Sequence, residues 1–433
     1  MKIVKMIPAI LIMLLLSGCM GTEPNDIAYV VAMGFDEGND NNYKITIQFA
    51  KPTQISGGAS EEGGKGGDIV ENVTVEAPNI YSGINVANNI VSKKFSLSHA
   101  KIMVFSKEIA QKGLNDILET LVRSYEIRPD MYLAVSVDGA EKYLNEIKPV
   151  IEVNPAKYYQ LTYEKDGSVG IPENNVMNFY FCQNRLYRDG VLPLAGIMSE
   201  SQSDSSSSQN SSGGEESNES TEKESEKQKS IPVNDEGYEY NMKNYIAGEV
   251  AIMEKNKSES MGMAIFQENK MIGIMGGIDS EIYNILNGDY KYAYISFFSE
   301  KSPDVPITVK LQQRKKPKIK VDTKNKKIRI KLYLESDLYS LPANYITEYD
   351  VTSFEKESKK YIEDACKKFI DKTINEYHAD ILGFITKAKK SFATYNKFTE
   401  NDWSSTFSDY EIEINTEFYV RHSGMTMRED NTK

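Results

Sequence analysis

Apolar and polar residues alternate along several stretches of the first 140 residues, as they do in strands that bury one face. The alternation predicts strands at 27–33, 43–49 and 69–75, and two further strands are predicted at 102–105, a short stretch that looks buried, and at 132–137. Between these stretches apolar residues recur every three or four positions, which predicts helices over 79–94 and 107–123. Strands mixed with helices in this order indicate an N-terminal α/β domain over residues 19–150.

A middle domain over residues 151–300 shows the same mixture. We predict helices at 155–163, 174–185 and 279–286, and strands at 192–197, 248–254, 262–267 and 271–275. The polar residues 267–270 join the last two strands as a hairpin.

The C-terminal domain, residues 301–433, has the clearest pattern. Strands are predicted at 305–311, 318–322, 327–334 and 410–420, and one long helix at 354–392. The outer face of 327–334 is basic and that of 410–420 is acidic, so we predict that these two strands pair through cross-strand ion pairs. The expected result is an antiparallel sheet packed by the long helix.

Together these elements predict an α+β (mixed α/β) fold of three domains, each a mostly antiparallel or mixed sheet packed with helices. Residues 56–67 are rich in glycine and predict a flexible loop. Residues 199–230 are so rich in serine and glutamate that we expect a disordered insertion in the middle domain. The insertion fits either a spacer or phosphorylation tract or an expanded surface loop, and the low cost of closing a long loop favours the surface loop.

The N-terminus has the parts of a lipoprotein signal peptide, residues 1–18. Lys2 and Lys5 form its positive end, residues 7–16 are an apolar run too short to span a bilayer, and Leu16-Ser17-Gly18-Cys19 is a lipobox. We therefore expect cleavage just before Cys19 and an S-diacylglycerol and an N-acyl group on that cysteine. Because two acyl chains hold a protein durably, the expected location is a membrane surface. An uncleaved anchor with a buried cysteine is disfavoured by the shortness of the run.

Charge excludes one class of partner. Without the signal peptide the chain keeps 49 basic side chains against 63 acidic ones, and a nucleic-acid binder needs a basic surface. We therefore expect no nucleic-acid partner and membrane attachment through lipid rather than through charge.

No constellation of residues predicts catalysis, a metal site or a cofactor. The three histidines, at 99, 378 and 422, lie outside any zinc-protease motif, and the chain has no nucleophile elbow or phosphate-binding loop. The glycines of 273–277 fit a strand and turn better than a nucleotide loop. His99 fits a packing residue better than a general base, and Trp403 fits a core anchor better than a ligand platform.

Two cysteines remain beyond the lipobox. Cys182 and Cys366 fit either a disulfide or two buried thiols, and their separation by 184 residues favours two thiols.

A set of stretches follows the lipobox in a distinctive order: Asn25–Asp36, Phe95–Lys101, Glu126–Asp130, Ala264–Phe266 with Lys270–Gly273, Asp380–Phe384 with Trp403 and Phe407, and a last strand ending at Gly424. As a set they resemble the Ger(x)C family, the lipoprotein C subunits of spore nutrient germinant receptors. The sequence departs from the family at Met20-Gly21-Thr22-Glu23, where the family usually has a tryptophan, and in the serine-rich insertion.

The resemblance implies three α/β-type domains and no enzymatic activity. It also implies a complex with two integral-membrane partners, the A and B receptor subunits, at the exported face of the spore inner membrane. Two other classes share the lipobox. A solute-binding lipoprotein of a transporter would have two lobes with parallel sheets, which the alternating C-terminal third disfavours. A cell-surface hydrolase would need a cluster of reactive residues, which the sequence does not show.

Mass spectrometry of the purified mature protein tests the lipid anchor. We expect Cys19 as the first residue, with the added mass of a diacylglyceryl and an acyl group. A Cys19→Ser variant should carry no lipid, because the thiol that would take it is gone. An intact Met1 or a bare Cys19 in the wild-type protein would refute the assignment.

Overall fold

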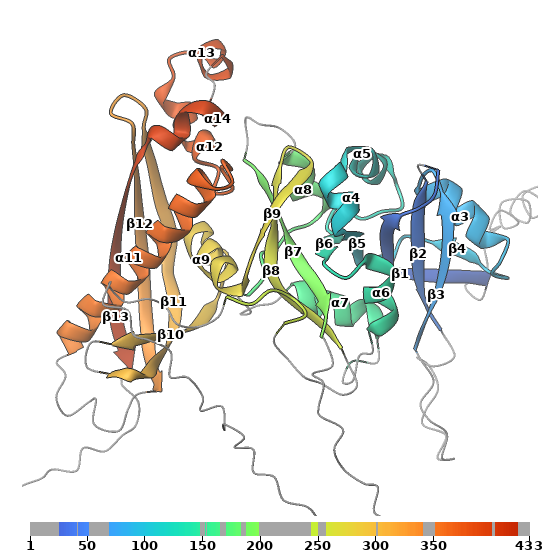
Figure 1. The fold of residues 1–433 in the computed structure, drawn as a ribbon, viewed down its shortest axis with the longest axis horizontal. Helices are drawn as coiled ribbons and strands as arrows, with labels where there is room; N and C mark the ends of the chain where they lie inside the picture. Colours follow the sequence, from blue (N-terminus) through green and yellow to red (C-terminus); the bar gives the residue numbers. More distant parts are fainter. Residues whose placement is uncertain are drawn as a thin grey trace, which may run out of the picture. The chain divides into compact units, whose positions relative to one another are not determined.

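The computed structural model describes residues 26–40, 42–51, 69–147, 152, 154–164, 170–182, 188–198, 244–249, 257–299, 302–340, 351–400 and 403–422. They divide between two compact units (Figure 1). The first unit lies within residues 1–165, 173–197 and 263–274, and the second within residues 166–172, 198–262 and 275–433. The loop segments 56–67 and 199–230, and most of the predicted strand 248–254, lie outside the described residues.

The first unit is a mixed sheet with helices. Its strands are β1 (Ile27–Glu37), β2 (Tyr43–Ala50), β3 (Val70–Ala77), β4 (Lys94–Ser96), β5 (Ile102–Ser106), β6 (Tyr132–Ser136), β7 (Gly190–Ile197), β8 (Ser258–Gln267) and β9 (Lys270–Met275). Its helices are α3 (Ile80–Asn88), α4 (Lys107–Lys112), α5 (Asn115–Arg123), α6 (Ala140–Glu146), α7 (Pro155–Tyr163) and α8 (Val176–Phe181). The sheet order is β3-β2-β1-β5-β6-β7-β8-β9, with β4 beside β1.

The strand β1 lies between the antiparallel and the parallel parts of this sheet. It is antiparallel to β2 and parallel to β5, and β5, β6 and β7 continue in parallel. Residues 30–33 of β1 are all buried, so both faces of the strand are covered, as parallel sheets require. Strands from both sides of residue 150 share the sheet, so backbone hydrogen bonds join the segments expected as N-terminal and middle domains.

The predicted helix over 107–123 is interrupted. It ends at Gly113, whose φ of 123° ordinary residues rarely adopt, and restarts after Leu114. The Leu114 side chain is buried and its amide donates to the carbonyl of Asn269 in the β8–β9 turn. Docking Leu114 against this hairpin therefore outweighs the continuous helix that the periodicity predicts. The predicted helix 79–94 is also shorter, because residues 94–96 pair with β1 as β4.

The second unit combines a four-stranded sheet with helices. Its elements are α9 (Gly277–Asn287), β10 (Tyr292–Ser299), β11 (Ser302–Asp322), β12 (Lys327–Ser340), α11 (Val351–Asn375), α12 (Phe384–Ala388), the 3₁₀ turn η2 (Lys389–Ser391), α13 (Tyr395–Thr399), α14 (Trp403–Thr406), the 3₁₀ turn η3 (Phe407–Asp409) and β13 (Glu411–His422). The sheet order is β10-β11-β12-β13. The two units confirm the predicted α+β (mixed α/β) fold class.

The predicted pairing of β12 with β13 is confirmed, but its direction is not. β10, β11 and β12 are antiparallel, whereas β13 runs parallel to β12. The fully antiparallel C-terminal sheet was therefore a wrong prediction. Alternation of apolar and charged residues places side chains on the same faces in either direction, so the pattern does not distinguish them.

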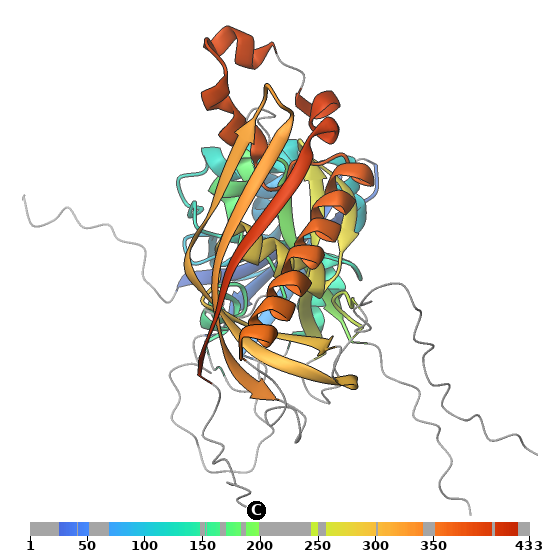
Figure 2. The same cartoon turned by 90° about the vertical axis from the view of Figure 1, so that its left-hand side faces the viewer.

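Helix α11 covers the outer edge of β13 (Figure 2). The carboxylates of Glu363 and Glu355 accept hydrogen bonds from the backbone amides of Thr416 and Val420, at 2.5 and 2.8 Å. These amides point away from β12, so the two glutamates satisfy donors that an edge strand otherwise leaves free. A neighbouring stripe of the helix, which includes Ile362 and Phe369, is buried in the core.

The prediction of a single helix over 354–392 was wrong, because α11 ends at Asn375 and α12 starts only at Phe384. His378 has a φ of 51°, a left-handed conformation that no helix continues through. Asp380 then caps α12: its two carboxylate oxygens accept from the amides of Phe384 and Ile385, both at 2.8 Å.

Asp380 also binds the segment that follows α12. The indole Nε1 of Trp403 donates to it at 2.9 Å, and the Trp403 ring stacks on Phe407 at 6.0 Å. Both Asp380 and Trp403 are 4% exposed. Burial raises the pKa of Asp380 to about 6, and the hydrogen bonds from Ile385, Phe384 and Trp403 oppose that rise, so the group is an ionised acceptor at neutral pH. The prediction of Trp403 as a core anchor is confirmed.

Replacing Asp380 by alanine should destabilise the second unit by roughly 3 kcal/mol, because buried donors from two segments lose their acceptor. Urea unfolding followed by Trp403 fluorescence measures this directly, since Trp403 is the only tryptophan. Asp409→Ala is the matched control: its carboxylate pairs with Lys326 at an exposed site, so the change should stay within about 0.5 kcal/mol. Equal effects of the two variants would contradict the role of Asp380.

Candidate functional site

The predicted lipidation site, Cys19, lies outside the described residues. In the part of the chain that the structure describes, no helix has the length and apolar character needed to cross a membrane.

The residues weighed for chemistry are dispersed. His99 is exposed, and its ring packs edge-on against Tyr29 at 4.9 Å. His378 forms the turn after α11, and the side chain of His422 is not described. Of the glycines in 273–277, Gly273 lies in β9 as predicted, whereas Gly276 and Gly277 form the start of α9 and not a turn. No group of metal-binding side chains occurs among the described residues.

Both internal cysteines are buried free thiols, as predicted. Burial raises the pKa of Cys182 and of Cys366, which keeps both as neutral thiols at neutral pH.

The stretches that carry the family resemblance contain side chains that bind segments distant in the sequence. In the first, Asp36 ends β1, and its two carboxylate oxygens accept from the amides of Ala140 and Glu141, both at 2.8 Å. Asp36 therefore caps α6 from more than a hundred residues away, in place of Gly139, which has no side chain. Burial raises the pKa of Asp36, opposed by these two hydrogen bonds.

Two further stretches meet in the first unit. The carboxylate of Glu126 accepts from the amide of Leu97 at 3.4 Å, which joins Phe95–Lys101 to Glu126–Asp130. In the hairpin stretch, Phe266 is buried and packs edge-on against Phe179 at 4.9 Å. With the contact between Asp380 and Trp403 in the second unit, these contacts give several of the resembling residues a structural role.

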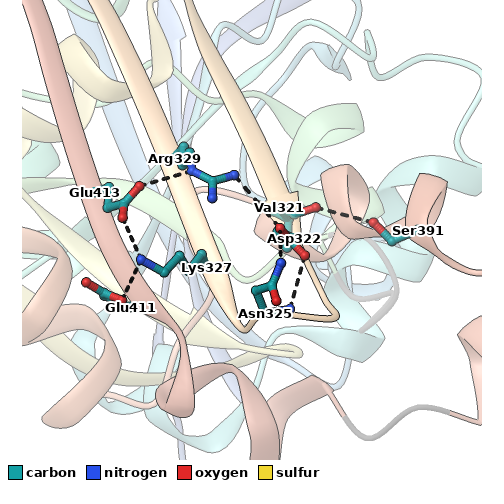
Figure 3. Close-up of polar contacts among 8 residues, drawn as sticks. All are labelled: Val321, Asp322, Asn325, Lys327, Arg329, Ser391, Glu411 and Glu413. Carbon is teal, nitrogen blue, oxygen red and sulfur yellow. Dashed lines mark hydrogen bonds and ion pairs between the residues drawn. The ribbon is translucent and has the colours of Figure 1, made fainter.

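The predicted charge ladder between β12 and β13 is present (Figure 3). Lys327 lies 2.9 Å from Glu411 and 2.7 Å from Glu413, and the Nε of Arg329 lies 3.0 Å from Glu413. Figure 3 also shows the β11–β12 turn, where Asp322 accepts from the side-chain amide of Asn325 at 2.9 Å. The ladder side chains are partly exposed, so each pair contributes little stability and mainly fixes the register.

A concave site lies within the second unit. It is a groove of about 860 Å³ whose lining comes mainly from α9, β10 and α11. That volume falls within the range of small-molecule sites, roughly 300–1,000 Å³. Its apolar lining consists of Ile278, Ile282, Ile295, Phe297, Ala365 and Phe369, with Tyr361 stacked on Phe297 at 4.8 Å.

The lining also carries charged side chains, and Glu281 is one of its five acidic residues. The spacing of Ile278, Glu281 and Ile282 places all three on one face of α9. Burial raises the pKa of Glu281 to about 8. Sequence analysis missed this residue, although an acid within an apolar helical stripe is a signal that marks it.

Comparison with known protein families agrees with the resemblance seen in the sequence. Residues 21–197 match the family described as the spore germination protein N-terminal domain, and residues 261–424 match the spore germination B3/GerAC-like C-terminal domain. The chain therefore belongs to the Ger(x)C family of spore germination proteins.

Individual relatives are more distant. The chain is similar to spore germination protein KC of Bacillus subtilis (strain 168), 29% identical over 33% of this chain and 36% of that protein. It is similar to the putative spore germination protein YfkR of the same organism, 28% identical over 33% of this chain and 38% of that one. The matches thus span little more than a third of either relative. Among solved structures, that of the GerBC protein covers 90% of this chain and 96% of its own, with 14% identity and a TM-score of 0.48.

Removing the Asp36 carboxylate should loosen the start of α6. For Asp36→Ala we expect hydrogen exchange at the amides of Ala140 and Glu141 to accelerate about tenfold or more, since a cap contributes about 1–2 kcal/mol. Asp116→Ala, at the exposed first turn of α5, should leave both amides unchanged. Unaltered exchange in the Asp36 variant would mean that Gly139 and the backbone alone hold the helix start.

Proposed function

We propose that this protein is a non-catalytic, lipid-anchored subunit of a spore nutrient germinant receptor. The observation that carries the proposal is the pair of family matches, which occur in order and cover residues 21–197 and 261–424. The names of the two curated relatives support a role in germination. The lipobox at Leu16-Ser17-Gly18-Cys19 supports attachment to a membrane by lipid.

In this proposal the protein acts through surfaces rather than through chemistry. The residues that carry the resemblance in the described part of the chain, such as Asp36 and Asp380, are engaged in holding the fold together. The partners would be the integral-membrane A and B subunits, at the exported face of the spore inner membrane. Lipid on Cys19 would keep the two units beside those partners.

A solute-binding lipoprotein of a transporter is a weaker proposal. That class would have two lobes with parallel sheets, whereas β10, β11 and β12 are antiparallel and the first sheet is mixed.

A deletion strain of the encoding organism, lacking its other nutrient receptors, tests the role. Spores that carry the wild-type gene should germinate on nutrient, and spores without it should not, because the receptor is incomplete. A gene with Cys19→Ser should restore germination poorly, since the protein loses its tether. Both strains should respond equally to a trigger that bypasses nutrient receptors. Normal nutrient germination without the protein would contradict the proposal.

A further inference from the structure

One end of the second unit is formed by the β11–β12 turn together with the segment from α12 to α13. The two lie at the same end of that unit in both views (Figure 1, Figure 2). The hydroxyl of Ser391 in η2 donates to the carbonyl of Val321 in β11 at 3.3 Å, and α12 packs on the same strand. We call this region, residues 318–326 and 384–400, the basic end.

The basic end holds eight lysines but only two acids, Asp322 and Glu400. Lys326 pairs with Asp409 at 2.7 Å, and Asp322 accepts from Asn325 within the turn. The other seven lysines are exposed and have no ion pair with any residue that the structure describes: Lys318, Lys320, Lys324, Lys387, Lys389, Lys390 and Lys397. Their positive charge is therefore open to a partner.

This concentration of positive charge contrasts with the rest of the chain. Over its full length the chain has 51 basic and 63 acidic side chains, so the basic end belongs to an acidic protein. Charge separated in this way creates a field that turns one end of a molecule toward a negative surface. The overall charge does not cancel that orientation, because salt screens distant charges more than near ones.

An exposed aromatic ring accompanies these lysines. Tyr395 in α13 is 61% exposed, and the Nζ of Lys389 lies 5.6 Å from the centre of its ring. The ring of the buried Phe398 lies 6.3 Å from that of Tyr395, so α13 is held by packing while Tyr395 stays accessible. Tyrosine is enriched where a membrane meets water, because its ring is apolar and its hydroxyl is polar.

The distribution of the lysines indicates the kind of partner. They come from β11, from the turn that follows it, and from α12, η2 and α13, so a partner that meets them all has to be broad. The surface of an anionic bilayer is broad and attracts each lysine that comes near it. It is also the surface beside which lipid on Cys19 would hold the protein.

We propose that the basic end docks on an anionic lipid surface, with its lysines near the headgroups and Tyr395 at the boundary with the acyl chains. The inference deepens the proposed attachment by lipid and rests on it for the nearness of a bilayer. Lipid on Cys19 would keep the protein at the membrane, and the basic end would determine which side of the second unit faces it.

Co-sedimentation with vesicles tests the docking. The protein is the full mature chain with Cys19→Ser, so that no acyl group contributes. We expect vesicles of equal parts phosphatidylglycerol and phosphatidylcholine to bind it at least tenfold more tightly than vesicles of phosphatidylcholine alone. Added salt should weaken that binding, because it screens the lysines from the headgroups.

Combined variants locate the contact. Lys389→Gln, Lys390→Gln and Lys397→Gln together should weaken binding to the anionic vesicles at least tenfold, since each lysine near such a surface contributes attraction. The matched control combines Lys356→Gln, Lys367→Gln and Lys368→Gln, three exposed lysines of α11, and should bind as the parent chain does. Both variants change the net charge equally, so only the place of the charge differs.

A second set at the turn, Lys318→Gln with Lys320→Gln and Lys324→Gln, should also weaken binding at least tenfold. All these side chains are exposed, so the variants should unfold at the same temperature as the parent chain, which thermal unfolding checks.

The proposal is overturned if both kinds of vesicle bind equally, or if the α11 control loses as much binding as the variants of the basic end. Binding to polyglutamate without binding to the anionic vesicles would also overturn it and would indicate an acidic protein segment as the partner. None of these outcomes changes the lipid mass at Cys19 or the germination phenotype of the deletion strain, so the two proposals fail separately.

Discussion

The parallel pairing of β12 with β13 constrains the whole second unit. Two antiparallel strands can be joined by a short turn, but a parallel strand must start again from the same end of the sheet, so the chain has to travel back along it. Helix α11 makes that return: its 25 residues cover about 37 Å. The crossover also delivers the helix that covers the β13 edge and forms one wall of the groove. The contacts of α11 with the edge of β13, the hydrogen bonds of Asp380 and the groove are all formed by the segment that connects β12 to β13. They therefore depend on the parallel direction of β13.

The helical segment that connects β12 to β13 must also end before β13 can begin. Asp380 does this with one carboxylate that holds α12 and the Trp403 indole. Asp36 does the same in the first unit, where it holds the start of α6 against the end of β1. In both places a buried acid gathers donors from segments that are distant in sequence, because a charged acceptor forms stronger hydrogen bonds than a neutral one. Stretches typical of the Ger(x)C family thus correspond to places where the chain changes direction.

Most strands and the fold class could be predicted from the sequence, because strands that bury one face alternate with a period of two, and the fully buried β5 and β6 are short apolar stretches. Strand β10 was missed because residues 292–299 are largely apolar or aromatic and show little alternation. The break after α11 was missed because it depends on His378 in a left-handed conformation, a position where glycine is the usual signal. At the other break a glycine, Gly113, is present. The helical spacing of apolar residues on both sides of it nevertheless predicted a continuous helix.

The candidate site could not be predicted from the sequence, for a different reason. Its lining comes from three elements, and a groove exists only once α11 has been placed beside α9 and β10. Glu281 was visible as an acid on an apolar helix face, yet nothing in the sequence places Phe297 and Tyr361 near it. The charge ladder of Lys327 and Glu413 could be predicted because complementary alternation on two strands is a local pattern, whereas the return of the chain is not.

The two glutamates on α11 have a wider consequence. An open strand edge is a template on which an extended segment of another molecule can continue the sheet, and repeated addition leads to fibrils. At Thr416 and Val420 the amides that such a segment would need are taken by Glu363 and Glu355. An incoming chain would have to displace two carboxylates and a whole helix before it gained its first bond. Helix α11 therefore protects this edge of the sheet against the addition of a further strand.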